Sequence, residues 1–469
     1  MEQLLDVYPN QEVVFDRALI EQLAGSGPRY TSYPTADRFH DGFTEQHYLK
    51  VLQERHAGAL FKPLSLYVHV PFCNTICYYC GCNKIITKDT SRADQYLDYL
   101  EKELALLAQT LPKRPRLAQL HFGGGTPTFL NDAQLARVMQ MINGTFELIA
   151  DGEYSIEIDP RKVSAQTVQN LAQLGFNRMS VGIQDFDLTV QKAVNRVQSE
   201  EETKLVMEAA RANGFKSISV DLIYGLPHQT TATMATTLEK VLALSPDRIA
   251  LYHYAHLPHL FKPQRRIDQE AVPNSVEKLD ILQDCVSTLT EKGYVFIGMD
   301  HFAKPDDELV KALRQGRLQR NFQGYSTHAD CDLIGIGVSS IGKVGASYIQ
   351  NTRDADEYYA ALDQGHLPVM RGMTLTRDDL LRRSIIQALM CRFALAFDVY
   401  EETYGIQFAE YFAEELAQIT AFERLGLVVQ DHGFLVVTPK GRFLIRNIAM
   451  VFDRHLREKK AQATYSQTV

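Results

Sequence analysis

Residues 64–82 of the 469-residue chain read LSLYVHVPFCNTICYYCGC, an apolar segment followed directly by four cysteines. Leu64 to Val70 is rich in β-branched and aromatic residues, which predicts a buried strand. The cysteines have the spacing C-x3-C-x2-C-x-C and are Cys73, Cys77, Cys80 and Cys82. The stretch therefore predicts a strand that carries a cysteine loop at its carboxyl end.

The same alternation of strand and helix recurs further along the chain. Six segments are predicted as strands: Leu64 to Val70, Leu117 to Phe122, Tyr154 to Asp159, Met179 to Gln184, Ile218 to Tyr224 and Ile249 to Ala255. Asn131 with Gln134 and Ser199 with Glu202 resemble capping boxes at the starts of intervening helices. The alternation predicts a parallel α/β sheet with right-handed crossovers, either open and doubly wound or curled toward a barrel.

Polar residues and glycines interrupt the apolar pattern where each predicted strand ends. Examples are Gly123-Gly124-Gly125 after the second strand and Gln184-Asp185 after the fourth. In both architectures ligands bind at the carboxyl ends of the strands. We therefore expect the site at this edge, where glycines would let the backbone present its polar groups to a ligand.

The composition limits the class of protein. The chain has 57 acidic and 49 basic side chains, a formal net charge of −8, and 45% hydrophobic residues. It contains no run of about 18 apolar residues and no basic, apolar leader at Met1, so we expect a cytoplasmic protein with no membrane segment. A net negative charge also disfavours nucleic-acid binding.

The cysteine loop favours an iron–sulfur cluster. The cysteine count of seven is odd, and without an export signal the thiols stay reduced. Three thiolates on one loop can hold three irons of a 4Fe–4S cluster and leave the fourth iron open. A structural zinc site normally has four ligands in two separated pairs, but no second pair exists. An electron-transfer cluster with Cys82 as the fourth ligand stays open as an alternative.

The spacing C-x3-C-x2-C after the first strand resembles that of radical S-adenosylmethionine enzymes. Further motifs resemble the oxygen-independent coproporphyrinogen III oxidases: Tyr67 to Cys73, Gly81 to Lys84, His121 to Thr128, Gly182 to Phe186, Asp221 to Pro227, Pro28 to Thr35 and Asn321 to Tyr325. The likeness runs from about Gly27 to about Arg457, which is nearly the whole chain.

The resemblance implies an α/β fold with a partial (βα)6, three-quarter TIM-like barrel, an N-terminal extension and a C-terminal, mainly helical, winged-helix-like domain. The expected divisions are residues 1–60, a segment covering the active site, 61–370, the barrel with a strand extension, and 371–469, the C-terminal domain. Within the last, Asp431-His432-Gly433 is predicted to join two hairpin strands, Gly426 to Val429 and Phe434 to Val437.

The activity that the resemblance implies is oxidation of two propionate side chains of coproporphyrinogen III to vinyls, giving protoporphyrinogen IX. Removal of hydrogen from an unactivated carbon is beyond acid–base catalysis, which typically contributes about 100- to 10,000-fold. A 5'-deoxyadenosyl radical, made from S-adenosylmethionine at the 4Fe–4S cluster, would remove it. The implied partners are a low-potential electron donor such as flavodoxin and an unidentified electron acceptor, and we expect a monomer.

The resemblance also implies roles for individual residues. The iron ligands would be Cys73, Cys77 and Cys80, and Cys82 matches an additional cysteine that does not bind the cluster. Residues implied to contact one or two S-adenosylmethionine molecules are Tyr67, Tyr79, Gly124, Gly125, Thr126, Glu157, Gln184, Arg196, Asp221, Ala255 and Ile341. Tyr79 stands where the family commonly has phenylalanine. Glu157 and Asp221 could instead be ordinary strand-end caps, and Ile341 ordinary core.

Arg29 and Tyr30 are the candidate residues for the substrate. A tetracarboxylate should meet basic side chains and hydroxyl groups, and Arg29 lies in a segment rich in hydroxyl groups that could fold over the cluster.

Two other functions remain as alternatives. One is a different radical S-adenosylmethionine reaction on a tetrapyrrole, which the product would reveal. The other is a haem-carrying chaperone, because haem-trafficking relatives keep the three-cysteine motif. Those relatives lack the segment Pro28 to Pro34 and the additional cysteine, and they carry a motif with tryptophan, which this chain does not contain.

Overall fold

The computed structural model describes residues 12–57, 62–328, 331–431, 433–458 and 465. The chain forms two compact units. The barrel unit comprises Phe39–Lys278 and Asp330–Thr374, and the terminal unit comprises Met1–Arg38, Leu279–Ala329 and Leu375–Val469. The expected divisions at residues 60 and 370 remain a prediction.

The barrel unit contains six parallel strands that follow the predicted segments. They are β1 (Leu64–Val70), β4 (Arg116–Gly124), β5 (Glu147–Ile158), β6 (Arg178–Gln184), β7 (Ser217–Tyr224) and β8 (Arg248–His253). Each pairs in parallel with the next along the chain. A doubly wound sheet would reverse its strand order at a switch point, whereas here the order advances in one direction, as in a barrel.

The other edge of this sheet is extended by later segments. β13 (Asp332–Ile336) pairs in parallel with β1, and β14 (Ile341–Val344), β15 (Ser347–Asn351) and β16 (Val369–Thr374) follow in antiparallel order. A short parallel pair, β2 (Phe72–Cys73) and β3 (Ile85–Ile86), lies in the cysteine region. The prediction of a partial α/β barrel is confirmed.

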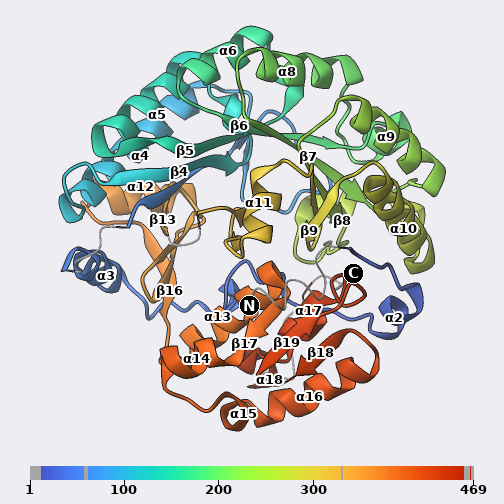
Figure 1. Ribbon diagram of the computed structural model, residues 1–469. Helices are drawn as coiled ribbons and strands as arrows, with labels where there is room; N and C mark the ends of the chain where they lie inside the picture. The colour runs from blue at the N-terminus through green and yellow to red at the C-terminus, as the bar shows by residue number, and fades with distance from the viewer. Residues whose placement is uncertain (1–11, 58–61, 329–330, 432, 459–464, 466–469) are drawn as a thin grey trace. The chain divides into compact units, whose positions relative to one another are not determined.

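Helices cover the outer face of the strands (Figure 1). They are α3 (Glu45–Ala57), α4 (Ser91–Thr110), α5 (Asp132–Thr145), α6 (Ala165–Gln173), α8 (Glu200–Ala212), α9 (Thr231–Ala243) and α12 (Ala355–Asp363). The short helix α7 (Leu188–Ala193) follows β6, and its Val190 belongs to an apolar cluster that packs against Tyr78 and Tyr79 of the cysteine loop. Both predicted capping boxes are present, Asn131 with Gln134 on α5 and Ser199 with Glu202 on α8. Leucines at helical spacing on α4, among them Leu97 and Leu104, are buried against the sheet side.

The terminal unit is mainly helical and includes α13 (Arg377–Arg392), α14 (Phe397–Tyr404), α15 (Phe408–Tyr411), α16 (Ala413–Arg424), α17 (Ile445–Met450) and α18 (Arg454–Glu458). A three-stranded sheet has the order β17 (Ala394–Ala396), β19 (Phe434–Val437), β18 (Val428–Asp431). Helices followed by a hairpin match the winged-helix-like prediction.

The predicted hairpin is present, but the predicted bounds of its first strand are wrong. β18 begins at Val428 rather than Gly426 and extends to Asp431, which pairs with Phe434. Gly426 has a φ of 71°, a left-handed conformation that ends α16 instead of beginning a strand. Of the turn residues, His432 lies outside the described residues.

The remaining elements of the terminal unit precede α13 along the chain. They are α2 (Arg17–Gln22), most of α10 (Ser275–Glu291), β9 (Val295–Gly298), β10 (His301–Ala303), α11 (Glu308–Arg314), β11 (Gln319–Asn321) and β12 (Gly324–Ser326). Among the helices of the described residues, none has the length and apolar character needed to cross a membrane.

Candidate active site

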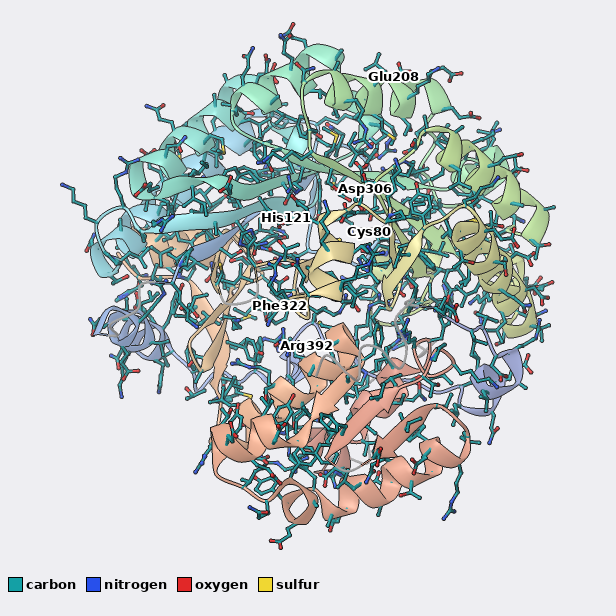
Figure 2. All side chains as sticks on the ribbon, viewed as in Figure 1. Cys80, His121, Glu208, Asp306, Phe322 and Arg392 are labelled. Carbon is teal, nitrogen blue, oxygen red and sulfur yellow. The ribbon has the colours of Figure 1, made fainter. Side chains whose placement is uncertain are left out.

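The predicted site residues of the barrel unit gather at the carboxyl edge of its parallel strands. They are Tyr67 on β1, Gly124 at the end of β4, Glu157 on β5, Gln184 at the end of β6, Asp221 on β7 and Ala255 just after β8. Ile341 begins β14, which runs antiparallel to β13 and so starts at the same edge. His121 and Cys80 lie inside the helical layer, whereas Glu208 lies on its outer rim (Figure 2).

The cysteine loop follows β1 and holds its thiols at different depths. Cys77 is buried, Cys73 and Cys80 are half-buried, and Cys82 is exposed. The backbone N–H of Cys80 donates to the carbonyl of Cys77 over 3.2 Å, which closes the loop. A hydrogen bond with Cys82 lowers the pKa of Cys80 to about 6, and burial raises the pKa of Cys73 to about 11. Iron binding would displace the remaining protons.

The residues fit a 4Fe–4S cluster better than a single metal ion. Within the described part of the chain, no three His, Cys, Asp or Glu side chains converge tightly enough to hold one ion. A cluster makes a different demand, because each thiolate binds its own iron. Three free cysteines on one loop meet that demand without converging on a point.

The glycine stretch at the end of β4 packs directly against the start of the cysteine loop. A Cβ atom on Gly125 would lie 2.7 Å from the carbonyl oxygens of Pro71 and Phe72. The N–H groups of Gly125 and Thr126 donate to Val70 and Phe72, each over 2.8 Å. These N–H groups are therefore used within the protein, and the glycines first of all allow β4 to approach the loop, a reason the sequence interpretation did not include.

Gly124 and Thr126 complete this contact. Gly124 has a φ of 116°, and a Cβ there would lie 2.5 Å from the ring of His69. The Thr126 hydroxyl lies 3.4 Å from the Cys73 sulfur. The predicted ligand-binding stretch thus also fixes one candidate iron ligand.

His69 is a site residue that sequence reasoning missed, although it lies in a quoted motif. Its Nε2 lies 3.1 Å from the carbonyl of Asn83 and its Nδ1 lies 3.0 Å from the Tyr67 hydroxyl. A carbonyl only accepts, so Nε2 donates and Nδ1 accepts from Tyr67. Burial lowers the pKa of His69 to about 4, which keeps the ring neutral. The signal was the spacing of two residues, which places Tyr67 and His69 on one face of β1.

His121 is the second missed residue. Its ring stacks on that of Tyr67 with centroids 5.9 Å apart. Its Nε2 lies 3.2 Å from Glu157 Oε1, and its Nδ1 lies 2.6 Å from the Ser155 hydroxyl. His121 therefore orients two residues implied to contact S-adenosylmethionine. The Glu157 side chain is 43% exposed, which leaves it accessible to a ligand.

Asp221 and Gln184 lie where two neighbouring strands change register. The pairing of β6 with β7 shifts between Gly182 and Gln184, and Gln184 has a φ of 67°. Such bulges redirect side chains beside active sites. Burial, together with the negative charge of Glu157, raises the pKa of Asp221 to about 7, while a hydrogen bond from Ser180 over 3.1 Å opposes the increase.

Tyr79 and Ala255 are joined by a buried residue that the sequence analysis did not identify. The side-chain amide of Gln264 donates to the carbonyls of both Tyr79 and Ala255 over 3.1 Å. The Tyr79 ring packs against an apolar cluster that includes Val190 and Tyr254. This contact links the cysteine loop to the end of β8.

Arg29 and Tyr30 belong to the terminal unit. The guanidinium of Arg29 forms an ion pair with Asp300. Tyr30 is 5% exposed, and its hydroxyl donates to Asp453 over 2.9 Å. Arg446 donates to the carbonyl of Pro28 over 3.0 Å. The segment is thus anchored by residues near the carboxyl end of the chain.

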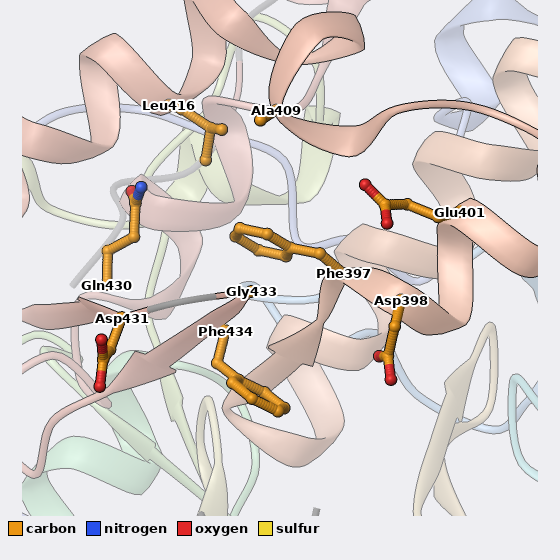
Figure 3. A pocket seen from close by; sticks show the side chains of 9 residues that line it. All are labelled: Phe397, Asp398, Glu401, Ala409, Leu416, Gln430, Asp431, Gly433 and Phe434. Atoms are coloured by element: carbon orange, nitrogen blue, oxygen red, sulfur yellow. The ribbon is translucent and has the colours of Figure 1, made fainter.

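A cavity of about 550 Å³ lies in the terminal unit among α14, α15, α16 and the β18–β19 hairpin (Figure 3). Phe397 projects into it, and Asp398, Glu401 and Asp431 contribute carboxylates. Glu401 accepts a hydrogen bond from the N–H of Phe408, and Asp398 accepts one from Val399, each over 2.8 Å. None of the predicted site residues lines this cavity, and two of its carboxylates cap local backbone.

Comparison with known proteins identifies the class. Residues 67–241 match the Radical SAM superfamily, and residues 375–444 match the HemN C-terminal domain. The partial barrel and its cysteine loop are thus those of a radical S-adenosylmethionine protein.

Full-length relatives identify the family. The chain is 48% identical over 459 residues to the oxygen-independent coproporphyrinogen III oxidases of Salmonella typhimurium strain LT2 and Escherichia coli strain K12, covering 98% of this chain and 99% of each relative. It matches the solved coproporphyrinogen III oxidase (HemN) from Escherichia coli, a radical SAM enzyme, with a TM-score of 0.90 and 47% identity, covering 95% of this chain and 100% of that one. The chain belongs to the family of oxygen-independent coproporphyrinogen III oxidases. The predicted family and its cofactors, a 4Fe–4S cluster and S-adenosylmethionine, are confirmed.

Proposed function

We propose that the chain oxidises coproporphyrinogen III without oxygen, converting two propionate side chains to vinyl groups and giving protoporphyrinogen IX. Each propionate loses one hydrogen atom, one carbon dioxide molecule and one electron. The observation that carries the proposal is the three-cysteine loop at the carboxyl edge of the barrel, in a chain similar over its full length to enzymes of that name.

The cofactors supply the step that amino acid side chains cannot perform. When bound, the cluster and S-adenosylmethionine provide the one-electron chemistry that removes hydrogen from an unactivated carbon. The protein binds and orients them and excludes competing reactions. We propose Cys73, Cys77 and Cys80 as the iron ligands and Cys82, which contacts Cys80, as a catalytic residue that does not bind iron.

The S-adenosylmethionine contacts are also a proposal. The proposal is supported by the positions of Tyr67, Glu157 and Asp221 on strands of the parallel sheet and by the bulge at Gln184. It is also supported by the hydrogen bonds that orient these side chains, from the Tyr67 hydroxyl to His69 and between His121 and Glu157. A second molecule of S-adenosylmethionine would be bound by Tyr79, Gln184, Arg196, Asp221 and Ala255.

We propose Arg29 as a contact for a substrate carboxylate. Its side chain is 31% exposed, so the guanidinium can be reached by a carboxylate, with which arginine forms charge-assisted hydrogen bonds. Tyr30 is buried with its hydroxyl bonded to Asp453, so its proposed contribution is to hold Arg29 in place. Arg29→Ala should weaken substrate binding with the cluster intact, and unchanged kinetics would remove Arg29 from the site.

The proposal includes an electron supply. Each cleavage of S-adenosylmethionine consumes one electron, so a low-potential donor such as flavodoxin is required, and the electron released from each propionate requires an acceptor. We further propose that the protein acts as a monomer in the cytoplasm.

The test is an anaerobic assay of the reconstituted full-length protein with reductant, S-adenosylmethionine and coproporphyrinogen III. Product mass should show loss of two carboxyl groups, with matching 5'-deoxyadenosine. Deoxyadenosine without decarboxylation would retain the radical chemistry but assign another substrate. Neither product, with haem retained on the protein, would favour the haem carrier.

A further inference from the structure

Two arginines point at the sulfur of Cys77. Arg196 Nη1 lies 3.7 Å from Cys77 Sγ, and Arg161 Nη2 lies 4.0 Å from it. Arg196 is implied by the family resemblance to contact S-adenosylmethionine, but Arg161 has no assigned role. Neither side chain is at the surface, since their exposed fractions are 8% and 17%.

Asp159 holds both guanidinium groups in place. Its Oδ1 accepts from Arg161 Nε over 2.9 Å, and its Oδ2 accepts from Arg161 Nη2 over 2.5 Å and from Arg196 Nη1 over 3.4 Å. The same carboxylate caps the short 3₁₀ helix Pro160–Lys162, which fixes the direction in which Arg161 leaves the backbone. The position of Arg161 is therefore determined by its own turn, independently of Arg196.

The charges of this group do not cancel. Two guanidinium groups and one carboxylate leave one positive charge in excess, and the side chain of Asp159 is only 12% exposed. Burial opposes ionisation of Asp159, but the hydrogen bond and charge of Arg161 and the charge of Arg196 outweigh it and lower its pKa. Asp221 offsets part of this charge at Arg196. The sulfur of Cys77 faces both guanidinium groups and, as a thiolate bound to iron, would bring a further negative charge beside them.

We propose that Arg161, held by Asp159 beside Arg196, raises the reduction potential of the iron–sulfur cluster through Cys77. The inference rests on the proposed function, because it takes Cys77 as an iron ligand. One-electron reduction adds a negative charge to the cluster, and nearby positive charge and N–H···S hydrogen bonds stabilise that charge. Arg161 is thus a positioning and tuning residue that touches a ligand of the cluster, not the substrate.

The test is the midpoint potential of the reconstituted full-length protein, followed by electron paramagnetic resonance during titration with dithionite, without S-adenosylmethionine or substrate. Arg161→Gln should lower the potential, so that at a fixed potential the ratio of reduced to oxidised cluster falls at least tenfold, or 59 mV for a one-electron couple. Asp159→Asn keeps a side-chain oxygen that can accept from Arg161, so that Arg161 stays in place, but it removes the negative charge that offsets the two arginines. It should therefore shift the potential in the opposite direction.

Lys162→Gln is the matched control. It removes the same charge from the next residue of the same turn, where the side chain is exposed to solvent. Its ratio of reduced to oxidised cluster should stay within twofold of wild type. A potential for Arg161→Gln equal to that of Lys162→Gln would overturn the inference, as would a lowered or unchanged potential for Asp159→Asn.

Iron and sulfide content separates this inference from the function on which it rests. A wild-type protein that assembles no cluster would contradict the proposed function itself. A wild-type cluster with an unshifted Arg161→Gln potential would contradict only the role of Arg161. If Arg161→Gln fails to assemble a cluster, Arg161→Lys, which keeps the charge, should assemble one with a potential near wild type, and the sign of the Asp159→Asn shift then decides.

Discussion

The cysteine site of the barrel unit and the Arg29 segment of the terminal unit are held in place in different ways. The barrel site is built from strand ends and from side chains two positions apart, such as Tyr67 and His69 on β1. The Arg29 segment is held by residues about 420 positions away, with Tyr30 bonded to Asp453 and Arg446 bonded to the carbonyl of Pro28. A repeating βα pattern defines the first arrangement, whereas only the folded chain reveals the second.

The largest effect is expected in the cysteine loop. Cys77→Ser should abolish the cluster and all activity, because a serine hydroxyl does not replace a thiolate as an iron ligand. The matched variant is Cys82→Ser, because Cys82 is an exposed cysteine of the same loop. This variant should keep the cluster but impair turnover. Iron and sulfide analysis with cluster absorbance checks both. A cluster in Cys77→Ser, or its loss in Cys82→Ser, would reverse the ligand assignment.

The next largest effect is expected from the substitution of a glycine in the barrel site. Gly124→Ala should lower the free energy of unfolding by about 3 kcal/mol, since its new Cβ meets the His69 ring at 2.5 Å and its φ is 116°. Gly175→Ala is the control, with a φ of 99° but no atom within 4 Å of the added Cβ. Urea unfolding of the two proteins should show the greater loss for Gly124→Ala. Equal losses would mean that backbone strain alone, not the contact with His69, requires the glycine.

In the terminal unit, Tyr30→Phe tests the anchoring of the Arg29 segment. It removes the hydrogen bond to Asp453 and leaves a buried carboxyl group without that donor, which should cost about 1–3 kcal/mol of stability. Tyr99→Phe is matched, because Tyr99 donates to Asp363 over the same 2.9 Å at the surface, and its effect should be much smaller. Indistinguishable denaturation curves for the two variants would show that the buried bond does not hold the segment.

The smallest effect is expected from pH, which should change the affinity of the barrel site for S-adenosylmethionine. The pKa of Asp221 is about 7, raised by burial and by the charge of Glu157. A cationic sulfonium ligand favours the ionised carboxylate, so affinity for S-adenosylmethionine should fall as pH drops through about 7, by at most tenfold per pH unit. Isothermal titration calorimetry of the reconstituted protein at pH values on both sides of this pKa measures the affinity. Asp221→Asn should flatten the dependence, and an equally steep profile in that variant would assign it to another group.

Much of the barrel could be predicted from sequence because its signals are local. The strand segments, both capping boxes and the cysteine spacing are each contained in a few consecutive residues. Periodicity could not distinguish a barrel from an open sheet, because strand order is a property of pairing. The roles of His69 and His121 depend on tautomers and contacts across strands, and the Tyr30–Asp453 bond joins residues with no pattern in common.

The most direct test of the proposed function uses coproporphyrinogen III labelled with deuterium at the propionate β-carbons. The account predicts that deuterium appears in 5'-deoxyadenosine while the product loses two carboxyl groups, because the hydrogen is removed at that carbon. Decarboxylated product together with unlabelled deoxyadenosine would contradict it, since the hydrogen would then have been removed from another position or by another route.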